Sequence, residues 1–123
     1  YLLFSSQGTP VTFNRGKSLD KVKQIVSYIE SHYTEPITVQ STADYLGFSE
    51  SHFMRYFKET MGTSFVDYLR DYRLTIASRL LTTSDSSILD IAAESGFENL
   101  SYFNRVFKQK YSMTPRQFRK ESQ

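Results

Sequence analysis

The chain contains the same short motif twice, about fifty residues apart. Each copy has an alanine, a glycine four positions later and a phenylalanine directly after the glycine. Two phenylalanines spaced by four follow, with an arginine and a lysine two and five positions after the first of them. The matching residues are Ala43, Gly47, Phe48, Phe53, Arg55, Phe57 and Lys58 in the first copy and Ala92, Gly96, Phe97, Phe103, Arg105, Phe107 and Lys108 in the second. Such a match within 123 residues indicates two copies of one supersecondary unit.

The residue types in the motif predict a helix, a tight turn and a second helix. The small alanine lets two helices approach, the glycine takes a positive φ at the turn, and the next phenylalanine fills the corner. The offset is 49 residues before the turn and 50 after it, so the second copy has one extra residue in its turn. If the spaced phenylalanines are buried, the opposite face of each second helix is exposed. That face carries Ser51, Met54, Arg55 and Lys58 in the first copy and Leu100, Ser101, Asn104, Arg105 and Lys108 in the second.

Apolar spacings of three and four predict seven helices and no convincing strand. The predicted N-caps, in order, are Ser18, Thr38, Ser49, Ser64, Ser87, Asn99 and Thr114. Ser64 with Asp67, and Ser87 with Asp90, resemble capping boxes. The helix after Ser64 should reach about Thr82, which makes it roughly 27 Å long at 1.5 Å per residue. The predicted fold is all-α: two helix-turn-helix units, homeodomain-like, joined by a long central helix.

The helices divide the chain into four segments. Residues 1–17 lack sustained helical periodicity, and we expect a linker with the remnant of an upstream domain, because the chain starts with Tyr1 and not with methionine. The first helix-turn-helix unit is predicted at 18–63, the connecting helix at 64–83 and the second unit at 84–123.

Composition excludes several classes of protein. A hydrophobic fraction of 39% with 15% aromatic residues is typical of a packed globular chain. There is no cysteine, no apolar run of the roughly 20 residues that a membrane span needs, and no pattern of a signal peptide. We therefore expect a cytoplasmic protein without membrane contact. The net charge is only +2, but from Glu98 to Lys120 there are six basic residues and one acidic residue. This basic second unit favours a nucleic-acid partner.

Helix-turn-helix units present the first half of their second helix to base edges in the major groove of DNA. Arginine can pair with guanine and asparagine with adenine, and an apolar side chain such as Met54 or Leu100 can touch the methyl group of thymine. Helix N-termini and hydroxyl groups suit phosphate. The predicted contacts to the DNA backbone are Thr38, Ser49, His52, Lys58, Asn99, Tyr102, Lys108 and Arg116.

From Ser18 to Arg119 the sequence resembles the DNA-binding domain of the AraC/XylS family of bacterial transcription regulators. The motif that carries the resemblance is Ile88, Ile91, Ala92, Gly96, Phe97, Ser101, Tyr102, Phe103, Arg105, Phe107 and Lys108, then Thr114-Pro115 and Phe118-Arg119. The first unit shows Leu46-Gly47-Phe48-Ser49, Phe53, Arg55, Phe57, Lys58 and Gly62, and the linker helix shows Arg73, Ala77, Leu80 and Leu81. Base-reading positions then fall on Ser51, Met54, Arg55, Leu100, Ser101, Asn104 and Arg105.

The resemblance implies sequence-specific binding to double-stranded promoter DNA, with the two recognition helices in adjacent major grooves. It further implies an activator, RNA polymerase as a second partner, and an upstream ligand-sensing or dimerisation domain in the full-length protein. One departure is Ser112, where the family usually has glycine. A non-glycine residue at positive φ costs about 1 kcal/mol, so we expect a reshaped cap there.

Other interpretations stay open at this point. A protein-interaction module that contacts RNA polymerase or another partner, with weak DNA binding, is the alternative function. His32 and His52 lack cysteine neighbours and are not spaced by four, so we predict no metal site and no cofactor. No nucleophile-elbow motif surrounds a serine, which argues against an enzyme. We expect Arg73 to pair with Asp90 or Glu94, although a DNA contact is an alternative.

Overall fold

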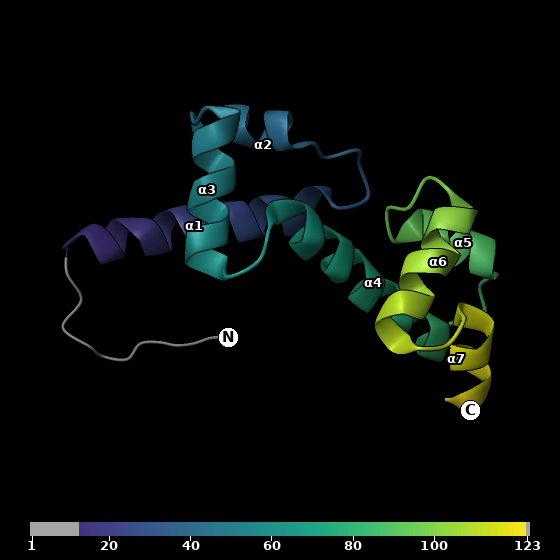
Figure 1. Ribbon diagram of the computed structural model, residues 1–123. Coiled ribbons are helices and arrows are strands. Elements are labelled where there is room, and N and C mark those ends of the chain that lie inside the picture. Colours follow the sequence, from purple (N-terminus) through teal and green to yellow (C-terminus); the bar gives the residue numbers. More distant parts are fainter. Residues whose placement is uncertain (1–12, 123) are drawn as a thin grey trace.

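The structure is a computed structural model that describes residues 13–122, and within this range it is all-α, as predicted. Its seven helices are α1 (Phe13–His32), α2 (Val39–Leu46), α3 (Glu50–Met61), α4 (Phe65–Thr83), α5 (Ile88–Glu94), α6 (Leu100–Tyr111) and α7 (Pro115–Glu121). Helices α1 to α3 form one group and α5 to α7 a second, and α4 runs diagonally from one group to the other (Figure 1).

Local capping determines where most of the helices begin. Six predicted caps, from Thr38 to Thr114, lie in extended backbone, and the side chain of each accepts a hydrogen bond from the N–H three residues later. At Ser64 and Ser87, where capping boxes were predicted, the side chain of the serine accepts this hydrogen bond, but the reciprocal bond from the backbone N–H of the serine is not formed. Reciprocal boxes occur instead at Thr38 with Ser41 and at Thr114 with Gln117. Each cap satisfies an N–H that the helix itself leaves without a partner.

The prediction that the first helix begins at Ser18 was wrong, because α1 begins at Phe13. Once a helix has formed, each further residue adds one hydrogen bond that roughly balances the entropy lost by fixing its backbone, so a helix extends easily. Gly16 lowers helix stability by only about 1 kcal/mol, which does not stop the helix. The segment 1–17, predicted as a linker with the remnant of an upstream domain, therefore ends inside α1. Its first twelve residues lie outside the described range.

Helix α4 belongs to two hydrophobic cores at once. Its first half contributes Phe65 and Leu69 to the core of the first unit, where Phe53 and Phe57 are almost fully buried. Its second half contributes three residues to the core of the second unit: Leu74, Ala77 and Leu81. The two cores share no residue. At 19 residues, α4 is about 28 Å long, so it holds the units apart while anchoring each of them.

The expected reshaping of the cap at Ser112 does not occur. Ser112 adopts the left-handed conformation, with φ 63° and ψ 17°, and its N–H bonds the carbonyl of Lys108 at 2.8 Å. In the first unit Gly62, at φ 80°, bonds the carbonyl of Lys58 at 2.9 Å. The serine therefore takes the same cap geometry as the glycine and tolerates the strain, because the helix and the following Thr114 cap are both held by their own bonds.

Candidate nucleic-acid interface

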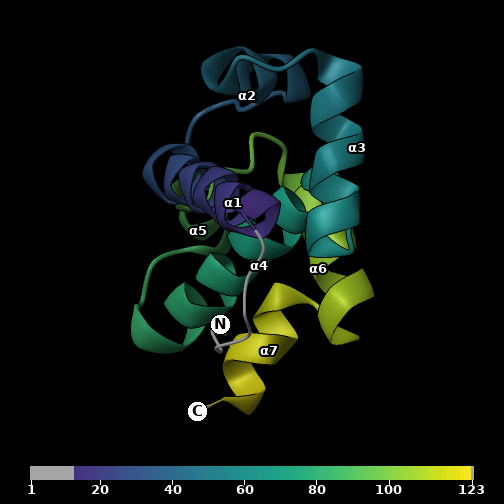
Figure 2. The same ribbon diagram turned by 90° about the vertical axis from the view of Figure 1, so that its left-hand side faces the viewer.

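Helices α3 and α6 lie on the same face of the molecule, with α4 set back between them (Figure 2). Both start at the upper end of the view in Figure 1 and run toward its lower end, so the two units are related as tandem copies. In each helix the phenylalanines of the repeat are buried, while the predicted base-reading residues are all exposed. The face that the periodicity predicted is thus open to solvent in both units.

In α3 the exposed face combines apolar and basic side chains. Ser51, Met54, Arg55 and Lys58 line one side of a groove of about 590 Å³, and Val66 from the start of α4 lines the other. Met54 has 51% of its surface exposed. This surface has a single guanidinium that can donate hydrogen bonds to a base edge, with an apolar neighbour of the kind that contacts thymine methyl groups.

In α6 the base-reading face is partly organised before any ligand binds. The guanidinium of Arg105 lies over the ring of Tyr102, at 5.2 Å from its centroid. Tyr102 in turn packs against the buried Phe97, with ring centroids 6.2 Å apart. A cation above an aromatic face is attracted to it, and at an exposed site the attraction is about 0.5 to 1 kcal/mol. Asn104 is exposed beside Arg105, so two polar readers stand together.

The predicted contacts to the DNA backbone are all exposed, and three of the eight are helix caps. The side-chain oxygens of Thr38, Ser49 and Asn99 accept helix N–H groups, which leaves their hydroxyl or amide hydrogens able to donate to a phosphate. The ring of His52 packs at a tilt against that of Phe48, with ring centroids 4.5 Å apart. Three exposed cations, Lys58, Lys108 and Arg116, form no ion pair within residues 13–122. Arg116 lies on the first turn of α7, after the C-terminal end of α6, and so is separated from the base readers.

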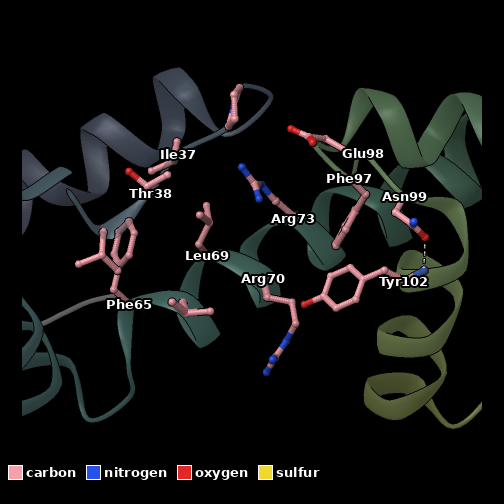
Figure 3. Close-up of a pocket in the computed structure, with 14 residues that line it drawn as sticks. Ile37, Thr38, Phe65, Leu69, Arg70, Arg73, Phe97, Glu98, Asn99 and Tyr102 are labelled. Carbon is pink, nitrogen blue, oxygen red and sulfur yellow. Dashed lines mark hydrogen bonds between the residues drawn. The ribbon is translucent and has the colours of Figure 1, made fainter. Parts of the chain in front are cut away.

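Three of these backbone candidates line a groove between the two units, Thr38 on one side and Asn99 and Tyr102 on the other (Figure 3). Thr38 comes from the first unit, whereas Asn99 and Tyr102 come from the second. The groove encloses about 360 Å³, and α4 forms its floor with Arg70 and Arg73. The hydroxyl end of Tyr102 points toward Arg70 in the close-up. Arg70 is held by Asp67 at 3.2 Å and by Asp71 at 3.8 Å.

The predicted ion pair of Arg73 with Asp90 or Glu94 was wrong. Its Nε donates to the carbonyl of Tyr33 and its Nη2 to the carbonyl of Glu35, both at 2.8 Å. Burial lowers the pKa of the Arg73 guanidinium, while the negative charge of Glu98 acts to raise it. Arg73 therefore supplies donors to two carbonyl groups of the turn that follows α1.

Arg119 donates to carbonyl groups at the end of α4, as Arg73 donates to carbonyl groups just after α1. Its Nε donates to the carbonyl of Leu81 at 3.1 Å and its Nη2 to that of Ser84 at 3.0 Å. Neither α1 nor α4 ends in a left-handed residue, whereas α2, α3 and α6 end at Gly47, Gly62 and Ser112. A helix without a left-handed cap still needs donors for its last carbonyls. That need is a signal that side-chain donors are required, but it does not identify Arg73 or Arg119 as the residues that supply them.

Two kinds of feature are absent from the described part of the chain. No helix there is long and apolar enough to cross a membrane. No group of three or more histidine, aspartate or glutamate side chains is placed to hold a metal ion.

Known proteins with similar sequences and folds include several transcription regulators. The "Helix-turn-helix domain" family profile matches residues 42–121. An uncharacterized HTH-type transcriptional regulator, SAS0078 of Staphylococcus aureus, is 37% identical over 113 residues, which are 89% of this chain and 15% of that protein. A transcriptional regulator from Chromobacterium violaceum, described as having an AraC-type DNA-binding domain, superposes with a TM-score of 0.78 at 30% identity, covering 87% of this chain and 96% of that one. The DNA-binding domain of the global transcription factor AdpA, solved with a target DNA, gives 0.78 at 26% identity, covering 80% and 89%.

The fold and the two exposed helix faces define a DNA-binding domain of the double helix-turn-helix class, which is not a class of enzymes. Because the family profile covers well over half of the chain, the assignment can be made at the level of the family. The chain belongs to the AraC family of transcription regulators.

Proposed function

We propose that this domain binds a specific sequence of double-stranded DNA by placing α3 and α6 in two successive major grooves. The observation that carries the proposal is the placement of both recognition helices on one face, in tandem, at the two ends of α4 (Figure 2). Successive major grooves on one side of B-DNA are about 34 Å apart. An α4 of about 28 Å with its flanking turns suits that separation.

Each class of residue has its own role in this proposal. Ser51, Met54 and Arg55 read bases in one groove, and Leu100, Ser101, Asn104 and Arg105 read them in the next. Helix caps, exposed cations and two aromatic side chains hold the phosphates: Thr38, Ser49, His52, Lys58, Asn99, Tyr102, Lys108 and Arg116. We expect α6 to contribute at least as much discrimination as α3, because Arg105 is held by Tyr102 and Asn104 stands beside it.

We further propose that the domain acts within a longer cytoplasmic regulator that activates transcription. The chain spans 15% of the length of the S. aureus relative. A ligand-sensing or dimerisation region and RNA polymerase are the partners we propose for the whole protein, and promoter DNA is the partner of this domain. A reporter gene placed behind the selected site measures the sign of regulation, and lower expression in the presence of the regulator would contradict activation.

The base-reading role of Arg105 gives the direct test. After in vitro selection of a bound duplex, Arg105→Ala should weaken binding by about 1 to 3 kcal/mol, roughly 5- to 150-fold, and relax the preference at one base pair. Arg79→Ala is the matched control, because it removes the same charge from an exposed position of α4 that lines neither groove. Unchanged affinity and specificity in Arg105→Ala would refute the assignment.

A salt series distinguishes specific reading from the alternative function. Binding to the selected duplex and to a scrambled one is measured across the series, since phosphate contacts give a steep salt slope on both. The proposal requires a clear preference for the selected duplex at every salt concentration. Equal binding to both duplexes would favour a protein-interaction module with only non-specific DNA affinity.

A further inference from the structure

The two units touch each other at a second place besides α4. The end of α1 and the turn between α5 and α6 meet there, at the carbonyl of Tyr33. A Cβ added at Gly96 would overlap that carbonyl oxygen and lie 2.8 Å from Nε of Arg73. We call Tyr33, Glu35, Arg73 and Gly96 the junction.

The junction is held by a rigid group. Arg73 donates from one planar guanidinium to two carbonyl groups, those of Tyr33 and Glu35, both at 2.8 Å. A fork of this kind fixes direction as well as distance. Only glycine fits at this turn, because a Cβ at position 96 would overlap the carbonyl oxygen of Tyr33. The backbone of the second unit therefore lies directly against the backbone of the first.

The junction lies where α4 passes from the core of the first unit to the core of the second. The core of the first unit ends along α4 at Leu69, and that of the second begins at Leu74. Of the four residues between them, 70–73, only Tyr72 packs against a core, that of the first unit. A bend in this segment would change the separation of the two units. Arg73 is in this segment, and its two bonds tie it to the end of α1.

We infer that Arg73 is a positioning residue that fixes the separation of α3 and α6, and with it the spacing of half-sites that the domain accepts. With α4 alone, the units sit at the ends of one rod, and a long helix can curve. The junction adds a second connection beside the rod, so that a bend at 70–73 requires breaking the bonds of Arg73. The part of this inference that concerns DNA rests on the proposed function.

The consequence for DNA is geometric. One base pair inserted between the half-sites moves the second half-site by about 3.4 Å and rotates it by roughly 35°, since one turn of about 34 to 36 Å holds 10 to 10.5 base pairs. A fixed pair of recognition helices cannot follow both changes. A domain with a loosened junction can do so by bending α4.

The first experiment needs no DNA. Because the chain has no cysteine, Thr60→Cys and Gln109→Cys, at exposed positions of α3 and α6, provide two unique sites for spin labels. Pulsed electron paramagnetic resonance then gives the distance distribution between the helices. We expect one narrow distance peak in the labelled parent. In Arg73→Met, which retains the aliphatic stem but loses both donors, the peak should be at least 1.5 times as wide as in the parent. Arg79→Met is the control and should leave the peak unchanged.

The second experiment measures binding to the selected duplex with zero, one or two base pairs inserted between the half-sites. The parent should lose at least tenfold in affinity per inserted base pair, whereas Arg73→Met should lose threefold or less. Arg73→Lys, which keeps the charge but cannot form the fork, should fall between them and replaces Arg73→Met if that variant does not fold by circular dichroism.

The positioning role of Arg73 and the proposed function can be contradicted independently of each other. An unchanged peak width in Arg73→Met and Arg73→Lys would overturn the positioning role, whatever the DNA results. A parent domain with no sequence preference at any spacing would overturn the proposed function, while the label distances would still decide the role of the junction. Equal spacing penalties in the parent and in both Arg73 variants would overturn the link between the junction and half-site spacing.

Discussion

Replacing Gly96 with alanine tests how closely the two units approach. Gly96 has φ +99°, and a Cβ there would overlap the carbonyl oxygen of Tyr33. Gly62 is the matched control, because it has φ +80° and nothing within 4 Å of an added Cβ. Both substitutions place alanine at a positive φ, but only one of them meets a backbone group of the other unit. The difference between the two therefore isolates the contact between the units.

The structure gives the expected magnitudes. At Gly62, alanine adds strain of about 1 to 2 kcal/mol, offset by about 0.4 to 1 kcal/mol from the lower entropy of the unfolded chain. The free energy of unfolding should then fall by about 0.5 to 1 kcal/mol. At Gly96 the overlap adds about 1 to 3 kcal/mol, and moving Tyr33 disturbs a charge-assisted hydrogen bond worth about 1.5 to 3 kcal/mol. The expected loss is about 3 to 7 kcal/mol, against a total stability of about 5 to 15 kcal/mol.

Urea unfolding followed by far-ultraviolet circular dichroism measures both variants. The midpoint should fall much further for Gly96→Ala than for Gly62→Ala, with folded-state helicity similar in both. In an Arg73→Met background the cost of Gly96→Ala should shrink, because the Arg73 bond is already absent. If the two glycine variants lose stability within about 0.5 kcal/mol of each other in the parent background, the close approach at the junction is refuted.

Two further predictions concern stability alone. Ser112→Gly should raise the free energy of unfolding by about 0.5 to 1 kcal/mol, because it removes the strain of a serine at φ 63° while keeping the bond to Lys108; an unchanged or lower urea midpoint would contradict this. Burial, with a smaller contribution from Glu30, raises the pKa of the Tyr68 phenol above its ordinary 10.0. The unfolded chain therefore loses this proton first, so the contribution is complete below about pH 10 and is lost as the pH rises through the higher folded value. Tyr68→Phe should show a shallower loss of stability in that alkaline range, and an identical slope would argue against the burial of this group.

Much of the fold followed from short-range patterns. The repeat predicted two units, and six N-caps were correct because a cap depends on a side chain and an N–H only three residues apart. The exposed faces of α3 and α6 followed from helical periodicity in the same way. The start of α1 was wrong by five residues, since the end of a helix depends on small differences in free energy.

The partners of the two arginines could not be predicted. Arg73 bonds carbonyls 40 and 38 residues away, and Arg119 bonds carbonyls 38 and 35 residues away. Nearby acidic residues such as Asp90 made an ion pair the natural expectation for Arg73. The better guide was the absence of a left-handed cap at the ends of α1 and α4, but that shows only that donors are needed and not which residues supply them.

The sequence by itself determined the two helix-turn-helix units, the caps of their helices and the side chains that each recognition helix exposes, because these depend on interactions between residues three to five apart. Only the tertiary structure decided how α4 is divided between two cores, which arginine closes which helix end, and how Gly96 brings the second unit against the carbonyl of Tyr33. These features depend on the packing of segments about forty to sixty residues apart. Their free energy comes from burial and from backbone groups that find partners only once the chain is folded.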